Sequence, residues 1–135
     1  MTFSPAALET LLAHFRETNR GPEDYDLIIT GDLGSVGSNV LCDLMKKEGF
    51  SLQDKHRDCG CMIYNMNTQD VHAGGSGCGC IASTLCGHIL PEMKKGNLSR
   101  ILAIGTGALL STTSGLQGET VPGIAHLVVI STEKE

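Results

Sequence analysis

The chain has 135 residues, of which 41% are hydrophobic, and a formal net charge of −5, which indicates one globular domain or part of one. The basic residues form no stripe interleaved with aromatic rings and there is no tryptophan, so we expect no nucleic-acid partner. No signal peptide opens the chain and no apolar run approaches the roughly 18–20 residues that span a bilayer. We therefore expect an intracellular protein, soluble or at most peripheral to a membrane, whose six cysteines are reduced.

The first part of the chain predicts a helix followed by a strand. Ser4 and Pro5 suit the cap and the first position of a helix. The apolar residues that follow recur at the period of one buried helix face, namely Leu8, Leu11, Leu12 and Phe15. The segment Asn19–Gly21 ends this helix, and the short apolar segment Tyr25–Thr30 predicts a buried strand.

A glycine-rich turn, Gly31–Gly37, leads into a second predicted helix that runs from about Ser35 to Glu48. Two lysines followed by Gly49 suit its C-terminal end. We expect four apolar residues of this helix to face inward: Val36, Val40, Leu41 and Leu44. Residues 51–69 are ambiguous, because Met62-Ile63-Tyr64 fits either one strand or one helical turn.

The most distinctive stretch is a run of small residues, Ala73–Cys80, which precedes a third predicted helix at about Ser76–Lys95. Its expected inward residues are Ile81, Leu85, Cys86 and Ile89, and Pro91 should kink or shorten it. Strands are predicted at Arg100–Gly105 and Ile124–Ser131, on either side of a polar loop at 108–122. This order of helices and strands is typical of a layered α/β domain with a small sheet.

Two Cys-Gly-Cys pairs, Cys59–Cys61 and Cys78–Cys80, invite comparison with a four-thiolate metal site. One intervening residue is too few for the usual chelating pair, so we expect small buried cysteines and no metal. The sequence does not define the roles of His72 and His126. A loop position before the glycines suits binding for His72, whereas apolar neighbours favour a structural, hydrogen-bonded His126.

Five segments of the chain resemble, in order and spacing, the C-terminal part of the stage V sporulation protein AD family. They read ITGDLGSVGS, DCGCMIY, DVHAGGSGCGCIAS, ILAIGTGALLS and GETVPGIAH. This family is a divergent branch of the thiolase-like superfamily. The resemblance implies that residues 1–135 form the C-terminal portion of a thiolase-like layered α/β domain, a small mixed sheet covered by helices.

The resemblance also implies that the chain is not an enzyme. Condensing enzymes of the superfamily carry a nucleophilic cysteine in the first half, and a histidine with an asparagine or second histidine on two loops of the second half. The matching places here read Gly31–Gly34 and Gly75–Gly77, with neither residue type. The carboxylate of Asp32 accepts hydrogen bonds only and cannot stabilise an oxyanion. Of the superfamily machinery, the glycine turn Gly105–Gly107 remains.

The resemblance points instead to binding and uptake of dipicolinic acid, a flat dicarboxylate, into the developing spore. Backbone N–H groups of a glycine nest suit such an anion. The expected ligand-binding residues are Asp32, Gly75, Ser76, Gly77, Cys78, Thr106 and Gly107, with Asp32 at the rim or bonded to a hydroxyl. No cofactor is expected.

The glycine run also has a purely structural interpretation, as a close contact between helices in the core. Two other functions stay open. One is a scaffold subunit that acts through contacts with other proteins of a sporulation channel complex, in the forespore and peripheral to its inner membrane. The other, less favoured, is an acyltransferase. Because the chain resembles only part of its family, we expect it to self-associate through the third helix or to be marginally stable.

Overall fold

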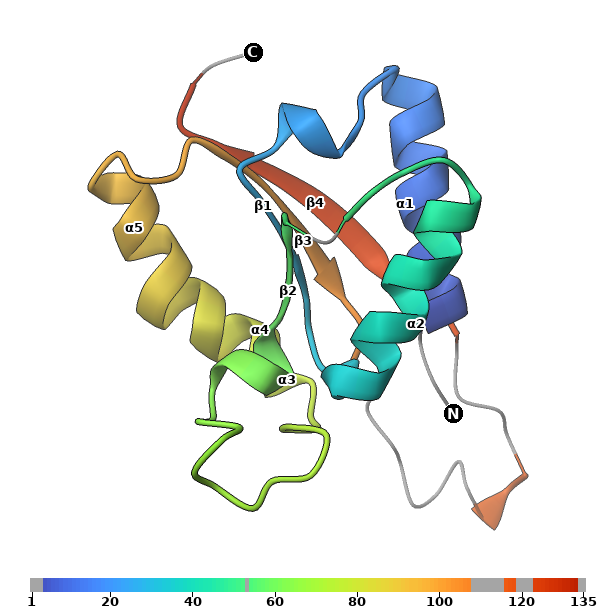
Figure 1. Ribbon diagram of the computed structural model, residues 1–135, viewed down its shortest axis with the longest axis vertical. Helices are drawn as coiled ribbons and strands as arrows, with labels where there is room; N and C mark the ends of the chain where they lie inside the picture. Colours follow the sequence, from blue (N-terminus) through green and yellow to red (C-terminus); the bar gives the residue numbers. More distant parts are fainter. Residues whose placement is uncertain (1–3, 53, 108–115, 119–122, 134–135) are drawn as a thin grey trace.

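A four-stranded mixed sheet in the order β2-β1-β3-β4 forms the centre of the protein (Figure 1). The structure, a computed structural model, describes residues 4–52, 54–107, 116–118 and 123–133. The strands are β1 (Leu27–Thr30), β2 (His56–Asp58), β3 (Arg100–Gly105) and β4 (His126–Ser131). β1 pairs in parallel with both β2 and β3, whereas β4 runs antiparallel to β3. The predicted small mixed sheet covered by helices is thus confirmed.

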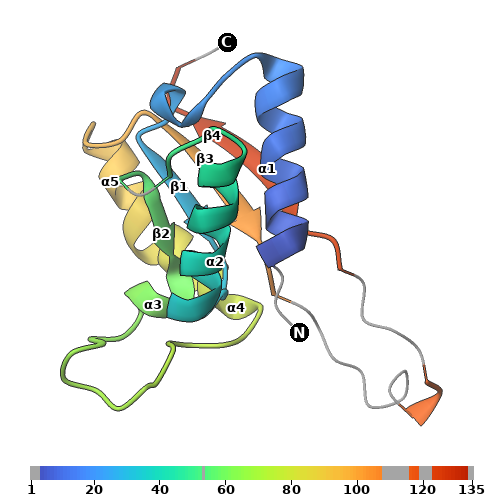
Figure 2. The same cartoon turned by 45° about the vertical axis from the view of Figure 1, so that its right-hand side comes forward.

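Helices cover both faces of the sheet, which explains why β1 and β3 are nearly continuous apolar runs. Successive side chains of a strand point to opposite faces. Ile28 and Leu102 therefore belong to the core beneath α1 and α2, while Ile29 and Ile101 belong to the core beneath α4 and α5. Figure 2 shows these two helical layers on either side of the strands.

The first helix, α1 (Ser4–Thr18), follows the predicted pattern. Leu11, Leu12 and Phe15 are buried in the core that it shares with α2. The helix ends where Asn19 adopts a left-handed conformation with φ of 52°, and the Arg20 N–H returns to the Phe15 carbonyl at 3.1 Å. This is a common way to satisfy the last carbonyl groups of a helix.

The inward face of α2 (Gly34–Lys47) differs from the predicted one. Val36 and Val40 were expected inside but are 64% and 40% exposed. Leu41 is buried as predicted and Leu44 is half-buried, while the other buried positions are Gly34, Gly37 and Met45. The reason is a close approach of two helices: the Ser4 hydroxyl donates to the Gly37 carbonyl at 3.0 Å, so a residue without a side chain faces inward there.

The third predicted helix is shorter and more irregular than expected. It consists of α4 (Gly79–Thr84), a π-helical turn, η2 (Leu85–Ile89), and α5 (Leu90–Lys94). The Leu90 N–H bonds to the Leu85 carbonyl, which widens the helix just before Pro91. A π-bulge is a recognised cause of a kink, but the helix continues through Pro91 to Lys94, so the kink or shortening expected at this proline stays a prediction. Cys86, expected inside, is exposed within this π-helical turn, whereas Ile89 is buried.

The ambiguous region 51–69 holds the largest departure from the sequence prediction. It contains the edge strand β2 and, directly after it, the short helix α3 (Cys59–Met62). A three-residue strand with a charged centre has no detectable period of its own. Met62 therefore ends a helical turn, and the sheet has one more strand than the sequence predicted.

Three further expectations can be compared with the described residues. A 3-10 turn, η1 (Pro22–Asp24), precedes β1, which begins at Leu27 and not at Tyr25. Ile124 precedes the last strand and is 65% exposed. Of the polar loop predicted at 108–122, all but residues 116–118 lies outside the described residues. Within the described part of the chain, no helix is long and apolar enough to cross a membrane.

Candidate functional site

Three turns converge at one edge of the sheet: Gly31–Gly34 after β1, Thr106-Gly107 after β3, and Gly75–Cys78 before α4. β1 and β3 are parallel, so their carboxyl ends meet at the same edge. In open α/β sheets that edge is where ligands commonly bind. The structure therefore brings together the three segments that the sequence nominated, and we name this group of turns the glycine site.

Asp32 connects the three turns. Its backbone N–H donates to the Thr106 hydroxyl oxygen at 2.9 Å, and that hydroxyl donates back to Asp32 Oδ1 at 3.0 Å. The other carboxylate oxygen, Oδ2, accepts from the Gly77 N–H at 2.8 Å. The expectation that Asp32 bonds to a hydroxyl is confirmed, because its partner is Thr106.

Glycines at the site are required by close backbone contacts. A Cβ on Gly107 would lie 2.5 Å from the Cys78 Cα, and one on Gly60 would overlap the Gly75 carbonyl oxygen. The Gly75 N–H in turn donates to the Gly60 carbonyl at 2.7 Å. The small-residue run therefore packs against the turn after β3 and against α3. These contacts support the interpretation that the run serves close packing in the core.

Several donors that we expected to hold an anion are already used within the protein. The Gly75 N–H bonds to Gly60, while the Gly77 N–H and the Thr106 hydroxyl both bond to Asp32. Ser76 and Cys78 are exposed at the same turn. The helix begins at Gly79, so Cys78 is its cap residue and the run is a connecting loop, not the first helical turn.

Asp58, the buried last residue of β2, was not predicted to belong to the site. Its Oδ1 accepts from the Thr30 hydroxyl at 2.6 Å and from the Leu33 N–H at 2.9 Å, and its Oδ2 accepts from the Gly34 N–H at 3.0 Å. One feature indicates that α2 needs an acceptor from elsewhere in the chain: its cap residue, Leu33, has no side chain that can accept a hydrogen bond. A helix start without a local cap requires an acceptor from elsewhere.

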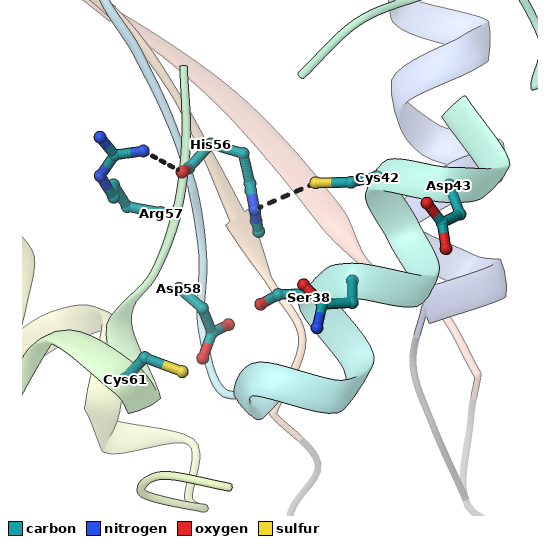
Figure 3. A pocket seen from close by; sticks show the side chains of 8 residues that line it. Ser38, Cys42, Asp43, His56, Arg57, Asp58 and Cys61 are labelled. Carbon is teal, nitrogen blue, oxygen red and sulfur yellow. Dashed lines mark hydrogen bonds between the residues drawn. The ribbon is translucent and has the colours of Figure 1, made fainter. Parts of the chain in front are cut away.

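Asp58 also lines a pocket of about 460 Å³ between α2 and β2. The pocket is lined by Ser38, Asn39, Cys42, Asp43, His56, Arg57, Asp58 and Cys61, seen from close by in Figure 3. His56 Nε2 lies 2.9 Å from the Thr30 hydroxyl and Nδ1 lies 3.8 Å from Cys42 Sγ. Because the Thr30 hydroxyl donates to Asp58, His56 Nε2 is the protonated nitrogen and Nδ1 is the acceptor.

Burial is the main influence on the pKa values of His56 and Cys42 in this pocket. It lowers the pKa of His56 to about 4 and outweighs the nearby Asp58 carboxylate, which acts in the opposite direction. Burial also raises the pKa of the Cys42 thiol, with a smaller contribution from the negative charge of Asp43. The pair is therefore a neutral imidazole facing a neutral thiol.

The Cys-Gly-Cys pairs behave differently from one another. Cys59 and Cys80 are buried as expected, Cys61 is partly buried and Cys78 is exposed. Burial raises the pKa values of Cys59 and Cys61 to about 11, so neither thiol is activated. Among the described residues, no three cysteine, histidine or acidic side chains are grouped closely enough to hold a metal ion.

The histidines considered from the sequence lie at the surface. His72 is exposed in a left-handed conformation with φ of 50°, and its ring nitrogen is 3.9 Å from the Asp70 carboxylate. His126, at the start of β4, is exposed and does not lie inside the apolar strand as its neighbours suggested. It lies on the same strand face as Val128, which is 55% exposed, whereas Leu127 and Val129 on the opposite face pack against the core.

Comparison with known proteins agrees with the sequence motifs. Residues 1–131 match the family described as Stage V sporulation protein AD. The chain is 48% identical over 126 residues to Stage V sporulation protein AD of Bacillus subtilis (strain 168), and the aligned region covers 93% of this chain but 37% of the relative. The chain therefore belongs to the stage V sporulation protein AD family, a group of sporulation proteins. It spans a little over a third of the length of the relative that it matches.

The contact between Gly107 and Cys78 yields a first prediction. Gly107→Ala should lower the free energy of unfolding by about 1–3 kcal/mol, because the added methyl group meets backbone that cannot turn away. Gly79→Ala is the matched control, since nothing lies within 4 Å of its Cβ and alanine favours a helix start. Urea unfolding of both variants measures the difference, and equal stabilities would contradict the close contact.

Proposed function

We propose that this chain is the C-terminal part of a thiolase-like sporulation protein that has no condensing activity and binds dipicolinic acid for uptake into the developing spore. Membership of the stage V sporulation protein AD family supports the role in sporulation. The observation that carries the absence of condensing activity is the arrangement of Asp32 at the glycine site, and the exposed turn at Ser76–Cys78 supports the binding of an anion.

The surroundings of Asp32 support a protein without acyl-transfer chemistry. An oxyanion hole needs hydrogen-bond donors that point at the reacting oxygen. Here the Gly77 N–H and the Thr106 hydroxyl point at Asp32 instead. A carboxylate in that position repels a developing negative charge, so the site opposes the transition state of a condensing enzyme.

A preformed turn at the edge of the sheet still suits a small anion. The exposed Ser76 hydroxyl and the backbone of Ser76 and Cys78 lie outside the contacts that Asp32 makes. Dipicolinate would bind at these atoms, with Asp32 at the rim. Because Asp32 carries a negative charge, it limits the affinity for a dianion and favours partial exposure of the ligand.

This site predicts opposite effects for two substitutions on dipicolinate binding. Ser76→Ala should weaken binding about tenfold, the worth of one hydrogen bond to a charged group, whereas Asp32→Asn should strengthen it by removing a like charge. Ser83→Ala, at an exposed position of α4, is the matched control. Calorimetric titration at low ionic strength measures each affinity, and thermal unfolding provides an independent readout, because a ligand of the native state raises the Tm.

Two outcomes would contradict the proposal. One is the absence of any Tm rise at millimolar dipicolinate. The other is equal weakening by Ser76→Ala and Ser83→Ala, which would place the binding atoms away from the glycine site.

A scaffold role is the second candidate, favoured by the outward face of the irregular helix. Ala82, Ser83, Cys86 and Gly87 are small and exposed along α4 and η2. Small residues allow another helix to approach closely. The chain corresponds to 37% of its relative, so a partner surface from the remaining length, a second copy or another protein of the channel complex could cover this face. In the scaffold role the protein would act in the forespore, peripheral to the inner membrane.

Self-association through this face is directly measurable. We expect light scattering to show a dimer or larger species at high concentration, or a protein of marginal stability. Ala82→Arg should dissociate the assembly, because it places a charged side chain in the contact, whereas Ala13→Arg, on the exposed side of α1, should not. A stable monomer at high concentration would contradict this expectation.

A further inference from the structure

An apolar wall adjoins the glycine site on the side of α3. Ile63 and Tyr64, which follow α3 directly, are 43% and 40% exposed. A Cβ on Gly75 would lie 2.7 Å from Ile63 Cδ1 and 3.1 Å from Tyr64 Cε2, so the absence of a side chain at residue 75 lets both side chains close over the turn. They therefore pack against the turn whose next residue, Ser76, is exposed.

Backbone hydrogen bonds hold this wall in place beside the turn. The Gly75 N–H donates to the Gly60 carbonyl at 2.7 Å, and the Ile63 N–H donates to the Cys59 carbonyl at 3.2 Å. The turn is thus joined to α3, and the residue after Ile63 is Tyr64. A side chain that is already positioned loses less conformational freedom when a ligand binds, so the Tyr64 ring is prepared for contact with one.

Hydrogen bonds to the carboxylates alone give the glycine site little affinity for a dianion. The Gly77 N–H and the Thr106 hydroxyl are engaged by Asp32, whose own carboxylate repels a negative ligand. A ligand of this site therefore needs a further source of binding free energy. Contact between an apolar ring and Tyr64 supplies it, because small-molecule sites combine apolar and aromatic walls with a few polar groups.

We infer that Tyr64 makes the glycine site specific for a flat aromatic dicarboxylate, an inference that rests on the proposed binding of dipicolinate there. The phenol ring stacks on the pyridine ring in an offset arrangement, while Ser76 and the backbone of Cys78 contact a carboxylate at the edge of that ring. The carboxylates of dipicolinate extend from the rim of its ring, so stacking on the ring face leaves them free for these contacts. An aliphatic dicarboxylate makes the polar contacts but gains no stacking.

Calorimetric titration of the protein with dipicolinate and with glutarate tests this inference. Glutarate has the same number of atoms between its two carboxylates but no ring, so the wild-type protein should prefer dipicolinate. Tyr64→Leu should weaken dipicolinate binding roughly 2- to 10-fold, the worth of an aromatic pair, and leave glutarate binding unchanged. Tyr64→Phe keeps the ring and should retain the preference. Val128→Ala, at a 55% exposed position of β4, is the matched control.

Proton NMR of the ligand gives a second readout, which a purely structural role of Tyr64 would not change. Protons that lie over an aromatic ring are shifted upfield by its ring current. The ring protons of dipicolinate should therefore shift upfield on binding to the wild-type protein and to Tyr64→Phe. With Tyr64→Leu the upfield shift should be lost even when the ligand saturates the site. Circular dichroism establishes that each variant is folded.

The inference is overturned if Tyr64→Leu keeps both the preference for dipicolinate and the upfield shift while Ser76→Ala weakens binding. The ligand would then bind at the glycine site without this ring, and the proposed function would stand. Equal weakening of dipicolinate and glutarate by Tyr64→Leu also overturns it, because Tyr64 would then support the fold of the turn. Absence of dipicolinate binding to the wild-type protein would contradict the proposed function and this inference together.

Discussion

The hydrogen bonds of the Asp58 carboxylate are the interaction on which the functional end of this protein depends. Three donors converge on this buried side chain: the Leu33 and Gly34 N–H groups and the Thr30 hydroxyl. Together they attach the last residue of β2 to the end of β1 and to the start of α2. A carboxylate that accepts backbone N–H groups at a helix start satisfies groups that would otherwise be orphaned, and its charge suits the positive end of the helix dipole. Through Leu33 and Gly34, Asp58 thus fixes the position of the turn that carries Asp32.

From the other side, the same turn is held by Thr106 and Gly77 through Asp32. The glycine site and the pocket between α2 and β2 are therefore in contact, since Asp58 lines the pocket and accepts hydrogen bonds from the Leu33 and Gly34 N–H groups of the glycine site. A displacement of the Asp58 side chain would act on Asp32 through the neighbouring Leu33 and Gly34, whose N–H groups donate to Asp58.

The sequence was informative wherever side-chain periodicity decides the structure. Leu11 and Phe15 on α1 were predicted because buried side chains recur at the helical period, and β1 and β3 because short apolar segments indicate buried strands. Periodicity predicted the wrong inward face for α2, where Gly37 faces inward and Val36 outward. Close packing against α1 requires a residue with no side chain at Gly37. Periodicity also failed at β2, which is too short to have a pattern.

The candidate site was predicted in part, for a similar reason. The resemblance to the family implied that the turns at residues 32, 75–78 and 106–107 belong to one site, and they do come together. Which donors remain available depends on contacts between residues distant in sequence, so the engagement of Gly77 and Thr106 by Asp32 was not visible. Asp58 and His56 were missed because hydrogen bonds, not periodicity, define their roles.

Amide hydrogen exchange in an Asp58→Asn variant, compared with Asp54→Asn at an exposed position of the preceding loop, tests most directly whether Asp58 holds the glycine site. Loss of its charged acceptor should cost about 1–3 kcal/mol. We expect faster exchange at the Leu33 and Gly34 amides and also at the Asp32 and Gly77 amides, which Asp58 does not touch, while Leu102 in β3 stays protected. Unchanged exchange at Asp32 and Gly77 in a folded Asp58→Asn variant would mean that Asp58 is a local helix cap only, and would contradict its role in holding the glycine site.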